Sequence, residues 1–173
     1  MGRVGAFSLA VAGLLSIATA APASAAPAIP NKQATAVVQV LPPIALRKLE
    51  DLNFATLGVY SAGTAVIDPN TDAMTTTGGI VHLGGLPYAA LFEAISPRRG
   101  VVIIRIPTKP VTITRNGGTE TMTISSWTLS GASNRTVVAQ EPISFKVGGT
   151  LTVANNQAEG LYTGTFDVDI QYP

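Results

Sequence analysis

The chain contains no cysteine, one histidine and few charged residues. The absence of cysteine excludes disulfide bonds, thiol catalysis, zinc sites with cysteine ligands and a lipid anchor attached to cysteine. Charged residues make up 12% of the 173 residues, about half the usual fraction. The net charge is +1, so we expect no basic surface for nucleic acid.

The N-terminus has the features of a secretory signal peptide. These are a positive residue, an apolar run and two candidate cleavage sites: Arg3, residues 4–20, Ala23-Ser24-Ala25 and Ala18-Thr19-Ala20. The pattern predicts a cleaved signal peptide over residues 1–25 and a Pro/Ala linker over 26–33. We therefore expect export to the periplasm, the cell surface or the medium, with no membrane span after cleavage.

The rest of the chain has the composition of a β protein. Apolar residues make up 46% of the chain, beside 17 glycines and 12 prolines, and no segment after the signal has a helical period. Short β-rich runs end at Gly, Pro or Asn. We expect a single all-β domain over residues 34–173, an antiparallel β-sandwich of the immunoglobulin-like or pilin-like type.

Three local patterns predict pairing within this domain. The runs 111–115 and 120–124 flank Asn116-Gly117-Gly118, which predicts a hairpin with Ile113 and Met122 toward the core. Gly148-Gly149 divides two further runs, which predicts a bulge or turn. Between Tyr162 and Tyr172 apolar and polar residues alternate strictly, which predicts one long strand in the middle of a sheet.

Few residues are candidates for chemistry. His82 alternates with apolar residues, and no serine has the surroundings of a catalytic nucleophile. Asp167 and Asp169 share a strand face, which predicts a solvated face. Asp68, Asn70 and Asp72 match the start of a calcium loop, but Ala73 and Gly79 replace the Gly and Glu that such a loop needs; a weak calcium site there stays open. We expect no enzyme, cofactor or metal site.

Two segments carry a family resemblance. They are Leu52-Asn53-Phe54-Ala55-Thr56-Leu57, with Ala55 where the family has glycine, and residues 147–168, beginning Val-Gly-Gly-Thr-Leu. Together they resemble a bacterial secreted family known as a domain of unknown function, number 4402. The resemblance runs from about Ala34 to Tyr172.

The same elements more distantly resemble spore-coat-U-type subunits of archaic chaperone–usher pili. That resemblance implies an incomplete immunoglobulin-like fold whose groove receives the N-terminal strand of a neighbouring subunit, and it implies a periplasmic chaperone. Here the donor strand would be residues 34–41, through Ala34, Ala36, Val38 and Val40. The groove would be lined by Phe166, Val168, Ile170 and Tyr172.

Two functions remain open at this stage. The first is a non-enzymatic, pilin-like subunit of a surface fibre, with self-association or a related subunit as its partner. The second is a self-contained periplasmic or surface binding module, in which 34–41 closes its own sheet and the loops 96–100 or 130–142 contact a ligand. The sequence pattern of 34–41 is the same in both cases.

Overall fold

The computed structural model describes residues 34–173, so the predicted signal peptide (1–25) and linker (26–33) lie outside the described residues. The chain divides into two units, Met1–Gln39 and Val40–Pro173. The second unit is all-β, and the described residues contain no helix. Its strands are β1 (Ala45–Glu50), β2 (Thr56–Ile67), β3 (Met74–Gly84), β4 (Ala90–Ile95), β5 (Gly100–Arg105), β6 (Val111–Arg115), β7 (Thr121–Leu129), β8 (Asn134–Val137), β9 (Pro142–Val153), β10 (Tyr162–Thr163) and β11 (Asp169–Gln171).

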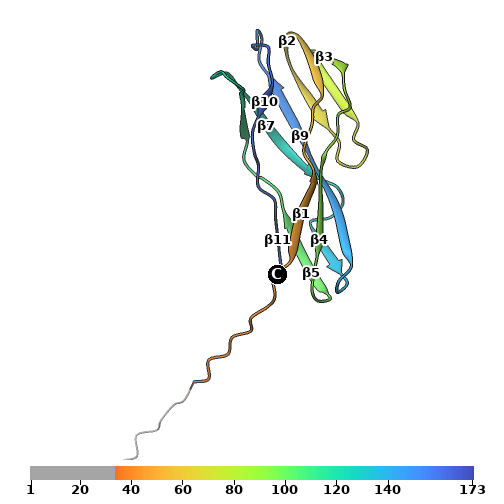
Figure 1. The fold of residues 1–173 in the computed structure, drawn as a ribbon, viewed down its shortest axis with the longest axis vertical. Helices are drawn as coiled ribbons and strands as arrows, with labels where there is room; N and C mark the ends of the chain where they lie inside the picture. Colours follow the sequence, from red (N-terminus) through yellow and green to blue (C-terminus); the bar gives the residue numbers. More distant parts are fainter. Residues whose placement is uncertain (1–33) are drawn as a thin grey trace, which may run out of the picture. The chain divides into compact units, whose positions relative to one another are not determined.

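The strands form two antiparallel sheets (Figure 1). The larger sheet has eight strands with the path β1-β4-β9-β7-β6-β10, and the β2–β3 hairpin joins it through pairing of β2 with β9. The smaller sheet has the order β11-β5-β8. The all-β, antiparallel prediction is therefore confirmed. Among the described residues, none belongs to a helix with the length and hydrophobicity needed to cross a membrane.

Strand β9 is the central strand of the larger sheet. One of its edges pairs with β4 through residues 142–147 and then with β2 through 149–153, while β7 pairs along the other edge. The change of partner falls at Gly148-Gly149. A Cβ at Gly148 would lie 2.2 Å from the carbonyl oxygen of Ile67, so only glycine allows this approach of the two backbones. The predicted turn is absent, because β9 continues through this pair, but a bulge does lie here: the register with β7 shifts between Ser125 and Thr128, opposite Gly148 and Thr150.

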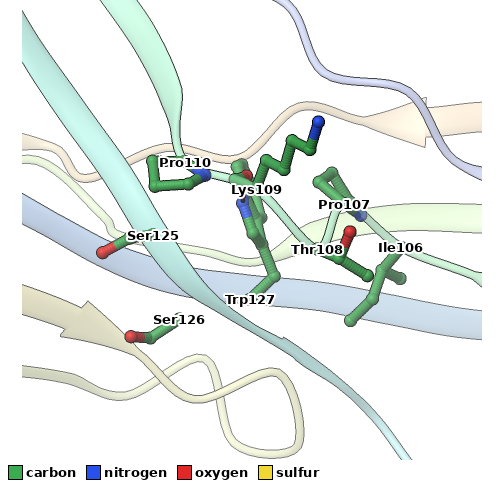
Figure 2. Close-up of a pocket in the computed structure, with 8 residues that line it drawn as sticks. All are labelled: Ile106, Pro107, Thr108, Lys109, Pro110, Ser125, Ser126 and Trp127. Carbon is green, nitrogen blue, oxygen red and sulfur yellow. Dashed lines mark hydrogen bonds between the residues drawn. The ribbon is translucent and has the colours of Figure 1, made fainter.

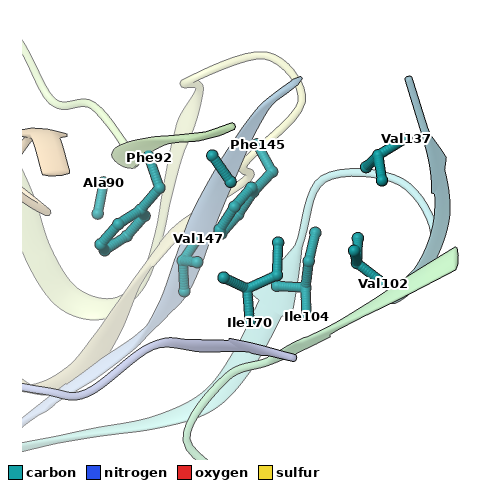
Figure 3. Close-up of a cluster of buried hydrophobic side chains, with 9 residues drawn as sticks. Ala90, Phe92, Val102, Ile104, Val137, Phe145, Val147 and Ile170 are labelled. Atoms are coloured by element: carbon teal, nitrogen blue, oxygen red, sulfur yellow. The ribbon is translucent and has the colours of Figure 1, made fainter. Parts of the chain in front are cut away.

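The buried apolar side chains form two hydrophobic cores. The first core draws on both sheets, and Figure 3 shows its side chains: Ala90, Phe92, Ala94, Val102, Ile104, Val137, Phe145, Val147 and Ile170. The rings of Phe92 and Phe145 stack with their centroids 5.5 Å apart. The second core lies on the larger sheet and consists of Ala65, Ile80, Ile113, Ile124, Leu151 and Val153. Strand β9 contributes side chains to both cores.

The hairpin prediction at Asn116-Gly117 is confirmed. Ile113 pairs with Met122 and Val111 with Ile124, and Ile113 and Ile124 are buried in the second core. Gly117 has φ 74°, the left-handed conformation that the turn requires.

Ala55 also has a left-handed backbone, with φ 57°. The side chain of Asn53 accepts a hydrogen bond of 2.8 Å from the Ala55 amide, which holds this turn between β1 and β2. This conformation costs an L-residue more than glycine. It gives a physical reason for the glycine that the resembling family has at this position.

Two alternating segments differ from a regular strand in this structure, and for residues 162–172 the prediction of one long strand is wrong. Residues 34–44 contain no strand, so the alternating pattern of 34–41 does not form one in this structure. The expected long central strand from Tyr162 to Tyr172 is two short strands, β10 and β11, that lie at the ends of different sheets. Strict alternation indicates that one face of a segment is apolar. It does not indicate whether the backbone of that segment pairs with one strand, with two or with none.

Candidate interaction site

The C-terminal segment, residues 162–172, brings the four predicted groove residues onto the first core. Ile170 is buried within this core, and Phe166, Val168 and Tyr172 pack against it while remaining partly exposed. The ring of Phe166 lies 6.4 Å from that of Phe92 and 4.7 Å from that of Trp127, between centroids. The shared apolar face that the sequence predicted is present, although most of this segment is not in a strand.

Strand β11 uses one backbone edge. It pairs with β5 through Asp169, Ile170 and Gln171, and it is the end strand of the smaller sheet within residues 34–173. An edge of this kind leaves backbone N–H and C=O groups free to pair with another extended chain.

Strand β1 is the end strand of the larger sheet and pairs with β4. Ile44 and Leu46 pack, partly exposed, against the same first core as Tyr172. The sequence alone does not distinguish β1 from a turn, because its Arg-Lys-Leu-Glu run fits a solvated turn or the edge of a strand. The available signal was the short apolar run at 44–46, which overlaps the start of the strand.

The end of the C-terminal segment is anchored by a buried polar contact. Ser96 is 1% exposed, its hydroxyl donates to the carbonyl oxygen of Arg98 at 2.6 Å, and it lies 3.1 Å from the Tyr172 hydroxyl. Since serine has one hydroxyl proton, Tyr172 is the donor in the second contact. The Arg98 guanidinium lies 4.3 Å from the centroid of the Tyr172 ring. The loop 96–100, a candidate ligand loop, therefore holds β11 in place.

The predicted donor residues lie in a segment without secondary structure. Ala34, Ala36, Val38 and Val40 are all exposed. The valines of this segment are unusually so, with Val37, Val38 and Val40 exposed by 87%, 85% and 86%.

The other ligand loop, 130–142, is partly a strand. Its residues 134–137 form β8, which pairs with β5. Arg135 donates to the carbonyl oxygens of Ala132 and Ser144 at 3.0 and 2.9 Å, and to that of Ser130. These bonds tie the loop to its own backbone and to β9.

The carboxylates of the candidate calcium loop already bond to other groups of the protein. Asp68 accepts a 2.8 Å bond from the Asn70 amide. Asp72 accepts a 3.0 Å bond from the Ala89 amide and forms an ion pair with Lys146. Burial raises the pKa of Asp72, but the bonds from Lys146 and Ala89 outweigh it and leave the pKa below its ordinary value. In residues 34–173 no three acidic or histidine side chains gather as metal ligands would.

The remaining polar candidates are His82, Asp167 and Asp169. His82 lies 3.1 Å from the carbonyl oxygens of both Gly84 and Gly85 through Nε2, so this nitrogen carries the proton. Asp167 and Asp169 are exposed.

Two cavities lie beside the loop of residues 106–110. The larger, of about 540 Å³, is lined by this loop and by residues 125–127 (Figure 2). Figure 2 shows the indole of Trp127 next to Lys109, and its nitrogen donates a 3.1 Å bond to the Lys109 carbonyl oxygen. Trp127 also packs, partly buried, against both cores. The smaller cavity, of about 310 Å³, includes Phe166 and Asp167.

Comparison with known proteins gives one match. No curated protein and no solved structure matches the chain significantly. A family model described as "Domain of unknown function (DUF4402)" matches residues 44–172, a range that contains every strand from β1 to β11. The protein therefore belongs to the DUF4402 family, as its two sequence segments predicted.

Proposed function

We propose that the protein is an exported structural subunit of a surface fibre, with an immunoglobulin-like, pilin-like β-sandwich fold. In this proposal residues 34–41 of one copy become a strand in the next copy. There they pair with the free edge of β11 and cover the apolar side chains between β11 and β1. The observation that carries the proposal is the unequal state of the two alternating segments, one in no strand and one paired along a single edge.

The acceptor side is supported by the first core. Its partly exposed apolar side chains include those at the two sheet ends: Ile44 and Leu46 beside β1, and Phe166, Val168 and Tyr172 around β11. An added strand here would bury these side chains and would pair the free backbone groups of β11.

The donor side is supported by the exposure and pattern of residues 34–41. Burying Val38 and Val40 would contribute roughly 1.5–3 kcal/mol each, and each ladder hydrogen bond about 1 kcal/mol. Ordering the segment costs roughly 1–2 kcal/mol per residue. Because these terms are of similar size, the association depends on an acceptor edge that is already formed.

The alternative, a self-contained binding module, has less support. It needs 34–41 to close its own sheet, and residues 34–44 contain no strand. Its candidate ligand loops are tied to their own fold, through Ser96 in one and Arg135 in the other.

The test is the size distribution of the protein after expression in a periplasm. We expect a ladder of multiples on a denaturing gel without boiling, which collapses on boiling, and thin fibres in electron micrographs of the same sample. A monodisperse, protease-resistant monomer that stays so with a cognate chaperone present would contradict the proposal.

A matched pair of variants identifies the segment responsible. Val38→Asp places a charge on the face that enters the acceptor, and it should abolish the ladder. Val37→Asp changes a neighbour of equal exposure on the opposite face of an extended chain, and it should keep the ladder. Equal loss in both variants would contradict the proposed register.

A further inference from the structure

The larger of the two cavities lies where the pairing of β6 with β7 ends. Strand β6 begins at Val111, opposite Ile124, whereas β7 continues to Leu129. Beside this second half of β7 lies the loop 106–110, which leads from β5 to β6. The cavity of about 540 Å³ lies between this loop and residues 125–127 (Figure 2). Its volume is in the range of pockets that bind small molecules.

The backbone of β7 is distorted at this cavity. Its register with β9 shifts between Ser125 and Thr128, and Ser126, within the bulge, has φ 50°. A left-handed conformation is costly for a residue with a Cβ. Because Ser126 is exposed, burial of its side chain does not offset this cost. Strained residues and bulges concentrate at functional sites, where they direct side chains toward a ligand.

The indole of Trp127 forms one wall of the cavity, and two contacts fix its orientation. Its nitrogen donates a 3.1 Å bond to the carbonyl oxygen of Lys109, and its centroid lies 4.7 Å from that of the Phe166 ring. The rings of Pro107 and Pro110 also line the cavity. Rigid apolar rings of this kind can pack against the C–H groups of a sugar ring at little cost in conformational entropy.

The polar side chains of the cavity are not used by the fold. Within residues 34–173, the serine and threonine hydroxyls that form hydrogen bonds belong to residues other than Thr108, Ser125 and Ser126. The ion pairs of the same residues do not include Lys109. Asp167 lines the smaller cavity together with Lys109 and is in none of these ion pairs. Three hydroxyls and one ammonium group are therefore available to a ligand.

We propose that this cavity binds an acidic saccharide, through a sugar unit that carries a carboxylate, such as a hexuronic acid. The indole and the proline rings pack against the C–H groups of the sugar, and the three hydroxyls bond to its hydroxyl groups. The Lys109 ammonium pairs with the carboxylate. A purely apolar ligand would displace water from these polar groups without replacing its hydrogen bonds. The site includes neither residues 34–41 nor β11, so it does not depend on strand exchange.

The chain contains a single tryptophan, so its fluorescence reports on this cavity directly. The full chain carrying Val38→Asp, which blocks the proposed strand exchange, is titrated with a trisaccharide of galacturonic acid and with the neutral trisaccharide of galactose. We expect a saturable change in Trp127 fluorescence with the acidic sugar, and an affinity lower by a factor of about three to ten for the neutral sugar. Equal affinity for the two sugars, or no saturable change with either, would overturn the proposal.

Three variants of the same chain test the named residues. Lys109→Gln should lower the affinity for the acidic trisaccharide by a factor of about three to ten. Arg99→Gln removes an exposed charge from a different loop and should leave this affinity unchanged. Ser126→Gly removes a hydroxyl and relieves the left-handed backbone, so it should weaken binding while it raises the midpoint of thermal unfolding. A Ser126→Gly variant that binds as tightly as the parent, or equal affinities for Lys109→Gln and Arg99→Gln, would overturn the proposal.

Discussion

The two alternating segments of this chain have the same sequence pattern and opposite surroundings. Residues 34–41 contain no strand, and their valines are almost fully exposed. Residues 162–172 place Ile170 in the first core, and β11 pairs with β5. The difference shows that an alternating pattern makes a segment suitable for a sheet, while the position of the sheet is decided elsewhere in the chain or in another molecule.

The comparison also separates the stability of the folded subunit from the stability of the assembly. Side chains of the C-terminal segment contribute to the folding of the subunit itself. Under the proposed strand exchange, side chains of the N-terminal segment contribute to stability only when an acceptor is present, so their effect belongs to assembly.

The largest effect on the isolated subunit is expected at Ile170. Ile170→Ala removes a side chain that is 9% exposed in the first core, and such changes cost about 2–5 kcal/mol. Val38→Ala should change the free energy of unfolding by less than about 0.5 kcal/mol, since the side chain is exposed. Urea unfolding of monomer measures both. Similar losses would show that 34–41 already belongs to the fold of its own subunit.

A smaller effect is expected from Tyr172→Phe. This change removes the hydroxyl that bonds to Ser96 and keeps the ring beneath Arg98. The cost should be about 1 kcal/mol, with loss of protection for β11 amides in hydrogen exchange. Tyr60→Phe, at an exposed tyrosine, serves as the control and should change neither quantity. Equal effects would argue against the anchor.

Ala55→Gly should stabilise the all-β unit without altering either alternating segment. It relieves the left-handed backbone at Ala55 and should raise the free energy of unfolding by about 1 kcal/mol, measured by thermal and urea unfolding. Assembly should be unaffected. A lower stability would mean that the Asn53 contact, rather than the backbone conformation, dominates this turn.

The smallest effect is expected on the free energy of unfolding at acid pH. Hydrogen bonds from Arg115 lower the pKa of Glu120 from 4.5 to about 2, and Arg115 pairs with Tyr162 at the start of the C-terminal segment. A lowered folded-state pKa means that this contribution to stability is present above about pH 4.5 and is lost as the pH falls toward 2. Glu120→Gln should flatten the pH dependence of unfolding in that window. Residues 34–41 contain no titratable side chain, so no matching change is expected there.

Local chemistry explains which parts of the fold the sequence predicts. The hairpin at Asn116-Gly117 depends on a turn whose residues are adjacent, and its register follows from that turn. The all-β class and the apolar face of 162–172 follow from composition and period.

Long-range pairing explains the errors. Gly148-Gly149 suggests a turn, but the glycine is required because the backbone of Ile67 approaches from another strand. The length of the last strand and the existence of β1 also depend on distant partners, β5, β6 and β4. The candidate site was predicted as a set of side chains, and the free edges that surround it could be recognised only from the sheet order.

The most direct test of strand exchange is a cross-link between two copies. Val38→Cys and Val168→Cys are introduced into separate copies of the cysteine-free chain, which are co-expressed and oxidised in the periplasm. The account predicts a mixed disulfide dimer from this pair, and none when Val37→Cys replaces Val38→Cys. A chain carrying both Val38→Cys and Val168→Cys that closes its disulfide within a single monomer would contradict the account, because residues 34–41 would then complete their own subunit.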